Sequence, residues 1–164
     1  MLVLILSLIG CGPSLELDIT GTVMDKNFSP VTAFWGQTMI SFVDVEMECI
    51  DMYWVDRVNI NGEDSEAGTD YQSMQITFLG DGIDLIVAGT HTEGGNAPIN
   101  AQFISSQEGV LSVVDSTEGS LNLDEVAGEE NPIAGAFNFN FNDGASGNLS
   151  GNFAGVEWCQ NIRD

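Results

Sequence analysis

Basic side chains are almost missing from this sequence. The 164 residues contain 25 acidic residues but only three basic ones, Lys26, Arg57 and Arg163, which gives a net charge of −22. A protein that binds nucleic acid needs a basic surface to neutralise phosphates, so we expect no nucleic-acid partner. Charged residues make up only 17% of the chain and apolar residues 43%, which is typical of a folded domain and not of a disordered acidic tail.

Histidine is scarce too, and recognisable catalytic motifs are missing. His91 is the only histidine, so a zinc site with two or three histidines cannot form within one chain. A serine or cysteine nucleophile needs a base, and neither G-x-S-x-G nor H-E-x-x-H occurs. We therefore interpret His91 as an ordinary loop residue and predict a non-enzymatic protein with no catalytic residues and no cofactor.

The chain also lacks a long hydrophobic run. Its most apolar stretch, residues 1–10 (MLVLILSLIG), is too short to cross a bilayer, which takes roughly 20 apolar residues. An uncharged apolar segment of this length fits the hydrophobic part of a secretory signal peptide. We expect residues 1–10 to be removed, which leaves a single domain over residues 11–164.

The end of this segment carries a further signal. Leu8-Ile9-Gly10-Cys11 resembles the lipobox of bacterial lipoproteins. The resemblance implies that Cys11 becomes the N-terminus and carries acyl chains such as palmitate, which would anchor the protein in the outer membrane of a bacterial cell envelope. A basic residue that usually opens such signals is missing, which we attribute to a start codon placed too late. The alternative is a buried first strand in which Cys11 is a core thiol.

Two further cysteines remain if Cys11 takes lipid. Cys49 and Cys159 then form an even pair, and an exported protein lies in a setting that permits disulfides. A bridge between them closes a loop of about 110 residues, which stabilises the fold by up to roughly 4.7 kcal/mol in the chain-entropy model. The alternative is two unrelated free thiols.

Residues 136–143 (AFNFNFND) give the clearest indication of secondary structure. Phenylalanines alternate strictly with asparagines, which predicts a half-buried strand whose phenylalanines face the core. Residues 147–156 follow a short turn and are expected to form the hairpin partner of this strand.

Other strand-length segments are separated by Gly, Asn and Asp and show no lasting helical period. We expect one hairpin of residues 74–79 with 83–89 and another of residues 110–114 with 119–126. The remaining predicted strands are 15–24, 32–43 and 100–105. The prediction is an all-β fold, an antiparallel β-sandwich or barrel of about nine or ten strands.

The order of short motifs is similar to that of small bacterial lipoproteins of the myxobacterial type. These proteins combine a lipobox with G-T-V, F-x-P-x-x-A, a strand that ends near a cysteine, and two later glycine–phenylalanine motifs, the last of which precedes a cysteine. The corresponding residues are Gly21-Thr22-Val23, residues 28–33, Ile40 to Cys49, residues 135–141 and Gly151 to Cys159. The resemblance implies the lipid anchor, the β fold and the disulfide, and it implies no catalytic residue.

Acidic clusters support two alternatives to a non-enzymatic module. Asp44, Glu46 and Glu48 would share one face of an extended strand, and paired carboxylates about 5–10 Å apart can cleave glycosidic bonds. Such a pair would suit a glycan hydrolase or lyase. The polar stretch 61–70 carries Glu63, Asp64, Glu66 and Asp70, oxygen ligands that calcium prefers, so a calcium-dependent binding module is the other alternative.

Tryptophans offer one more candidate surface. Trp35, Trp54 and Trp158 could stack on sugars, but we expect core or rim positions for them because aromatic side chains are usually buried. Taken with the lipobox, these observations favour a lipid-anchored envelope protein that serves as a structural, adhesive or ligand-binding module. Its expected partners are the membrane, through lipid on Cys11, and a protein, glycan or cation ligand.

Overall fold

The computed structural model describes residues 15–40, 45–53, 71–78, 86–94, 99–125, 131–142 and 146–158. These residues form an all-β fold, as predicted, with no helix among them. No helical segment in these ranges could cross a membrane. The strands are β1 (Glu16–Val23), β2 (Lys26–Asn27), β3 (Thr32–Ile40), β4 (Val45–Tyr53), β5 (Tyr71–Phe78), β6 (Gly89–Thr92), β7 (Ile99–Gln107), β8 (Val110–Glu125), β9 (Ile133–Asn142) and β10 (Ser146–Trp158).

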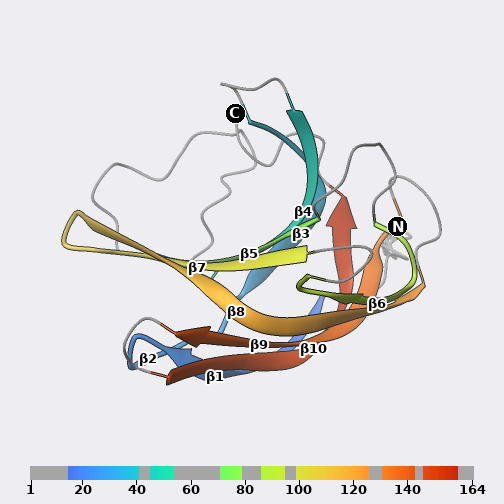
Figure 1. Ribbon diagram of the computed structural model, residues 1–164. Coiled ribbons are helices and arrows are strands. Elements are labelled where there is room, and N and C mark those ends of the chain that lie inside the picture. Colours follow the sequence, from blue (N-terminus) through green and yellow to red (C-terminus); the bar gives the residue numbers. More distant parts are fainter. Residues whose placement is uncertain are drawn as a thin grey trace, which may run out of the picture.

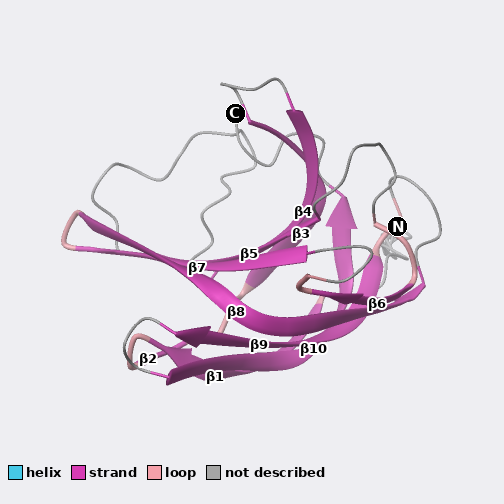
Figure 2. Cartoon of the chain, viewed as in Figure 1, coloured by secondary structure: helices cyan, strands magenta, loops and turns pink. Residues whose placement is uncertain are grey.

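The strands form one curled sheet whose two parts face each other across the core (Figure 1). We call the lower part sheet A; it contains β2, β1, β10, β9, the second half of β8, and β6. Sheet B continues from the end of β10 through β3, β4, β5 and β7 to the first half of β8. All pairings are antiparallel except that of β10 with β3, and the described chain is almost entirely strand (Figure 2).

Two long strands, β8 and β10, belong to both sheets. In β8, residues 110–115 pair with β7 and residues from Ser116 onward pair with β9, and the register shifts between Ser116 and Glu118. In β10 the register shifts between Phe153 and Val156, just before the strand reaches β3. Gly155 lies within this shift with φ of 68°, a conformation that glycine adopts without strain. Bulges of this kind bend a strand, so they let each long strand turn from one sheet into the other.

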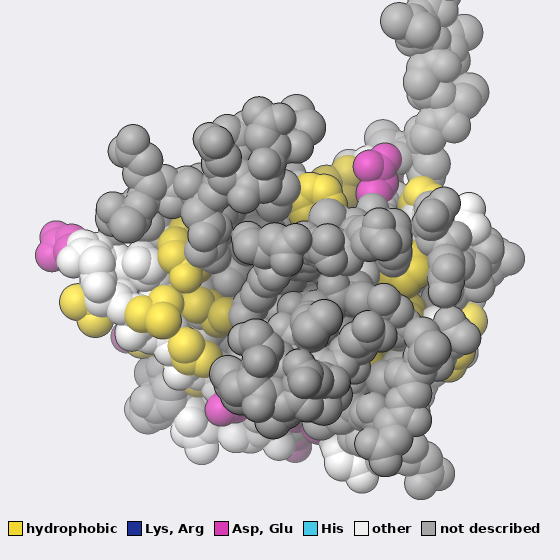
Figure 3. All heavy atoms as spheres, turned by 90° about the horizontal axis from the view of Figure 1, so that it is seen from above, with side chains coloured by type: hydrophobic (Ala, Val, Ile, Leu, Met, Phe, Trp, Pro, Cys, Tyr) yellow, Lys and Arg dark blue, Asp and Glu magenta, His cyan; other side chains and the backbone are white. Residues whose placement is uncertain are grey.

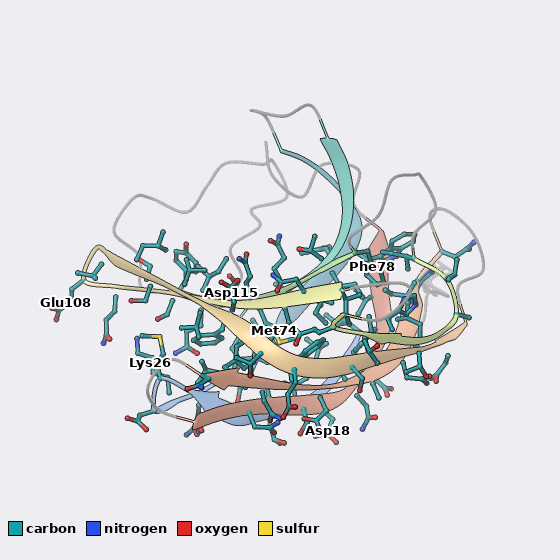
Figure 4. All side chains as sticks on the ribbon, in the orientation of Figure 1. Asp18, Lys26, Met74, Phe78, Glu108 and Asp115 are labelled. Carbon is teal, nitrogen blue, oxygen red and sulfur yellow. The ribbon has the colours of Figure 1, made fainter. Side chains whose placement is uncertain are left out.

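Aromatic side chains fill the space between the sheets. Phe137, Phe139 and Phe141 on β9 are at most 4% exposed, so the predicted inward face of this strand is confirmed. Phe103 on β7 packs against Phe141 with ring centroids 6.5 Å apart, and this contact joins sheet B to sheet A. Figure 4 shows Met74 of β5 between the same two layers. Burial of such side chains is the main driving force for the fold.

Tight turns close two of the hairpins. Met24 and Asp25, between β1 and β2, both have positive φ, of 55° and 59°. Glu108 and Gly109, between β7 and β8, have φ of 50° and 79°. Two consecutive residues with positive φ define the type I′ turn, whose twist matches that of the flanking strands.

The expected hairpin of 147–156 with the alternating phenylalanine strand is confirmed as β9 and β10, whereas the two other expected hairpins are wrong. β5 pairs with β4 and β7, and residues 86–88 are not in a strand, so 74–79 has no hairpin with 83–89. Residues 110–125 form the single strand β8, because Glu118-Gly119 is part of a bulged strand and not a turn.

His91 is a correction as well. The sequence predicts a loop position for His91, but it lies in β6 and is only 3% exposed. Its ring meets the ring of Phe78 edge to face with centroids 5.1 Å apart. Nε2 lies 2.8 Å from the carbonyl oxygen of Val87, and since a carbonyl only accepts, Nε2 is the donor.

Candidate functional site

The outer surface of sheet A is lined by short polar side chains. Apart from Lys26 on β2 and His91 on β6, the inward residues of its strands are apolar or glycine, and the outward residues are mostly Asn, Ser and Thr. On β9, for example, Asn138 is exposed while its neighbours Phe137 and Phe139 are buried. We call this outer surface the polar face. Figure 4 places Asp18, one of its residues, on the underside of the lower layer.

Strand register arranges the polar face in rows that run across the strands. Each row takes one residue from each of β8, β9, β10 and β1, and two of the rows continue onto β6. The row that we call the middle row consists of Thr92, Ser120, Asn138, Ser150 and Thr20. The row on one side of it consists of Thr90, Asn122, Ala136, Asn152 and Asp18. The row on its other side contains Glu118, Asn140, Asn148 and Thr22.

An amide network holds one side of the face in place. Asn148 Nδ2 donates to Asn138 Oδ1 at 2.7 Å and to Asn140 Oδ1 at 2.8 Å. Asn140 Nδ2 in turn donates to Glu118 Oε1 at 2.8 Å. Linked amides lose rotamer freedom once, on folding, so they need not lose it again when a ligand binds.

The middle row itself keeps most of its hydrogen-bonding capacity. Within the described ranges, the hydroxyl groups of Thr20, Thr92, Ser120 and Ser150 have no side-chain hydrogen bond. Asn138 uses its oxygen as an acceptor, and its Nδ2 has no described acceptor. The middle row therefore presents four hydroxyl groups and one amide donor toward solvent.

A groove of about 290 Å³ lies at the end of the polar face where β1 begins. Small side chains on adjoining strands leave room for the groove. Its polar groups are three carboxylates and one amide. The lining residues are Glu16, Asp18, Asp124, Ala134, Gly135, Ala136, Asn152, Phe153 and Ala154.

A buried polar cluster lies elsewhere, inside the fold beside β6. Ser116 Oγ hydrogen-bonds to the Glu93 carboxylate and accepts from the Ala101 amide at 3.1 Å. His91 bonds to Val87, while its Nδ1 has no partner. Because Ser116 is not hydrogen-bonded to the histidine, the cluster lacks the contact between nucleophile and base that acyl-transfer catalysis requires.

The predicted sulfur sites lie mostly outside the described residues. Cys11 and Cys159 are outside them, and of Cys49 only the backbone is described, in β4, where it pairs with Gly36 of β3 and Thr77 of β5. Trp158, the residue before Cys159, pairs with Trp35 of β3. The structure thus brings β10 and β4 to opposite edges of β3, and the disulfide remains a prediction.

Of the predicted tryptophan and acidic candidates, too, only some lie among the described residues. Trp35 is 4% exposed and donates from Nε1 to the Asn131 carbonyl at 3.1 Å, so it is a core residue, as expected, and not a sugar platform. Asp44 and the stretch 61–70 lie outside the described residues, whereas Glu46 and Glu48 lie on β4. Within the described ranges no group of three His, Cys, Asp or Glu side chains is arranged to hold a metal ion.

The polar face was not predicted from the sequence. The signal for part of it was present, because Asn138 and Asn140 alternate with buried phenylalanines. The rows, however, depend on β6, β8 and β1 lying in register beside this hairpin, and pairing between distant strands cannot be read from alternation alone.

Comparison with known proteins adds no functional information. No protein-family model matches the chain, and no curated protein or solved structure matches it.

Proposed function

We propose that this protein is a lipid-anchored module of the bacterial cell envelope that binds a ligand without chemical conversion, through the polar face. The observation that carries the proposal is an uncharged, hydrogen-bonding row at the centre of an ordered surface in a chain with a net charge of −22. The lipobox-like residues before Cys11 support the anchor. The proposed binding function requires no cofactor.

The tether between anchor and domain is short. Five peptide links separate Cys11 from Glu16, the first residue of β1, so the two Cα atoms lie at most about 18 Å apart. A lipid on Cys11 would therefore hold the groove end of the polar face close to the bilayer. The ligand is then a component of the cell envelope or of its immediate surroundings.

A paired-carboxylate hydrolase is the weaker proposal for this surface. Asp18 on β1 and Asp124 on β8 are separated by β10 and β9, which places their backbones about 14 Å apart at the usual strand spacing. Glycosidase carboxyl pairs lie about 5–10 Å apart. Glu16 and Asp18, two residues apart on β1, lie about 7 Å apart at the usual rise per residue, so a glycan hydrolase or lyase remains the alternative proposal.

Membrane fractionation tests the anchor. The full chain, preceded by a basic n-region and expressed in a Gram-negative host, is compared with its Cys11→Ala variant. We expect the unaltered chain in the outer-membrane fraction and the variant in the soluble periplasmic or unprocessed fraction, because one thiol carries the acyl chain. Equal distribution of the two proteins would contradict the lipid anchor.

A further inference from the structure

We infer that the ligand of the polar face is an uncharged linear polysaccharide that lies across the strands, along the middle row. This inference rests on the proposed binding function and adds the ligand class and the direction in which the ligand lies. The other polar clusters carry less, because the Glu93–Ser116 pair does not line the groove, although Glu93 Oε2 is buried without a partner, and the acidic groove has no group that points to a ligand.

Hydrogen-bonding chemistry is the first argument. Each hydroxyl of the middle row can donate one hydrogen bond and accept two, as each sugar hydroxyl can. Asn138 adds an oriented donor, since its oxygen is already held by Asn148 at 2.7 Å. A ligand rich in hydroxyl groups satisfies such a row, whereas an apolar ligand would bury these groups without partners, which is unfavourable.

Charge is the second argument. The middle row carries none, but Glu118 and Asp18 lie in the two rows beside it. An anionic polymer would be repelled by these carboxylates and by the net charge of −22. A polycation would be drawn to the carboxylates and would have no reason to follow the neutral row. The arrangement is complementary to an uncharged chain.

Dimensions are the third argument. Four strand spacings separate Thr92 from Thr20, so the middle row is about 19 Å long. Side chains in the row repeat once per strand, about every 4.8 Å. A row of evenly spaced, equivalent groups offers repeated contacts to a repeating polymer, and it offers no end at which a small molecule would be enclosed.

The test uses the full-length chain extracted in mild detergent and three polymers. The probes are hydroxyethylcellulose and chitin, which are uncharged, and alginate, which is anionic; binding is measured by affinity electrophoresis or co-sedimentation. The test variant, Thr20→Val, Thr92→Val, Ser120→Ala and Ser150→Ala, removes only hydroxyl groups that have no described partner. The matched control is Thr32→Val with Ser106→Ala in sheet B.

We expect an uncharged polymer to be retained by the unaltered chain and by the control, with about tenfold or greater loss of affinity in the test variant, because several hydrogen bonds are lost together. Circular dichroism and the melting temperature verify that the variant is folded. Equal binding by variant and control, binding to alginate alone, or binding to none of the polymers would overturn the inference. Membrane attachment in the fractionation experiment is independent of all three outcomes.

Discussion

Most polar groups that single residues bring into this fold have hydrogen-bond partners there. Trp35 satisfies its indole N–H with the Asn131 carbonyl, and Lys26 extends to donate to Ser105 Oγ at 2.9 Å. His91 satisfies one ring nitrogen through Val87 and leaves Nδ1 without a partner. Packing of the His91 ring on Phe78 stabilises the fold, whereas burial of Nδ1 without a hydrogen-bond partner destabilises it.

Substitution of His91 separates these contributions. His91→Ala removes a buried ring and is expected to lower the free energy of unfolding by about 2–4 kcal/mol. His91→Phe keeps a ring against Phe78, removes the unpartnered nitrogen and leaves the Val87 carbonyl unpaired, so we expect a change within about 1.5 kcal/mol. Urea denaturation measures both, and equal losses in the two variants would contradict the packing role.

At the scale of elements, the fold depends on turns and bulges as much as on strands. Alternation in the sequence correctly predicted β9 and the β9–β10 hairpin, because one face of each strand is buried. It failed at Glu118-Gly119, where a turn-like dipeptide directly follows the bulge in β8 and continues the strand. It also missed the turn at Glu108-Gly109, and the neighbours of β5 could not be predicted because they lie far away in the sequence.

The turn between β7 and β8 gives a test at this scale. Glu108 has φ of 50°, which costs energy for a side chain that is not Gly, Asn or Asp, and Asn is favoured at this position of a type I′ turn. Glu108→Asn is therefore expected to raise the free energy of unfolding by about 0.5–1 kcal/mol in thermal or urea denaturation. Glu108→Val, which suits a strand and not positive φ, should lower it; stabilisation by both variants would contradict the assigned turn.

The hairpin that carries this turn also has the exposed apolar side chains Val110, Leu111 and Val113. Figure 3 shows hydrophobic atoms at the surface at this end of the molecule. Leu111 and Val113 are 61% and 50% exposed. Apolar residues at an exposed strand are common on protein surfaces, and nothing in the structure indicates what would cover them.

For the whole molecule, the strand pairings form a closed path that runs from β10 through β3, β4, β5, β7, β8 and β9 back to β10. β10 pairs with β9 in sheet A and then, through Glu157 and Trp158, with β3 in sheet B. This parallel contact is the shortest pairing that joins the two sheets, and Cys159 follows it directly. A disulfide to Cys49 on β4, the other neighbour of β3, would reinforce this junction.

Geometry permits the bridge on one condition. Ile50 and Trp158 pair with opposite edges of Trp35, so their backbones lie about 9.5 Å apart. Disulfides need Cα atoms about 4.4–6.8 Å apart, which residue 159 can reach only if it lies on the β4 side of Trp158. We expect Cys49→Ala with Cys159→Ala to lower the free energy of unfolding by up to about 4.7 kcal/mol. Reduction of the unaltered protein with dithiothreitol should have the same effect, and insensitivity to dithiothreitol would contradict the bridge.

Charge makes a further prediction for the whole molecule. With 25 acidic and three basic residues, the folded chain concentrates negative charge that the unfolded chain disperses. Salt screens this repulsion, since the Debye length falls from about 30 Å at 0.01 M to about 8 Å at 0.15 M. The melting temperature is expected to rise with sodium chloride over this range. A fall would show that attractive ion pairs outweigh the repulsion.

Intact-mass measurement of the protein extracted from native membranes tests the central claim most directly. The account predicts a chain that begins at Cys11, is heavier than its sequence by the mass of attached acyl chains, and is two hydrogens lighter through a disulfide between Cys49 and Cys159. A chain that keeps residues 1–10 with an unmodified Cys11 would contradict the anchor, and with it the placement of the polar face at the bacterial envelope.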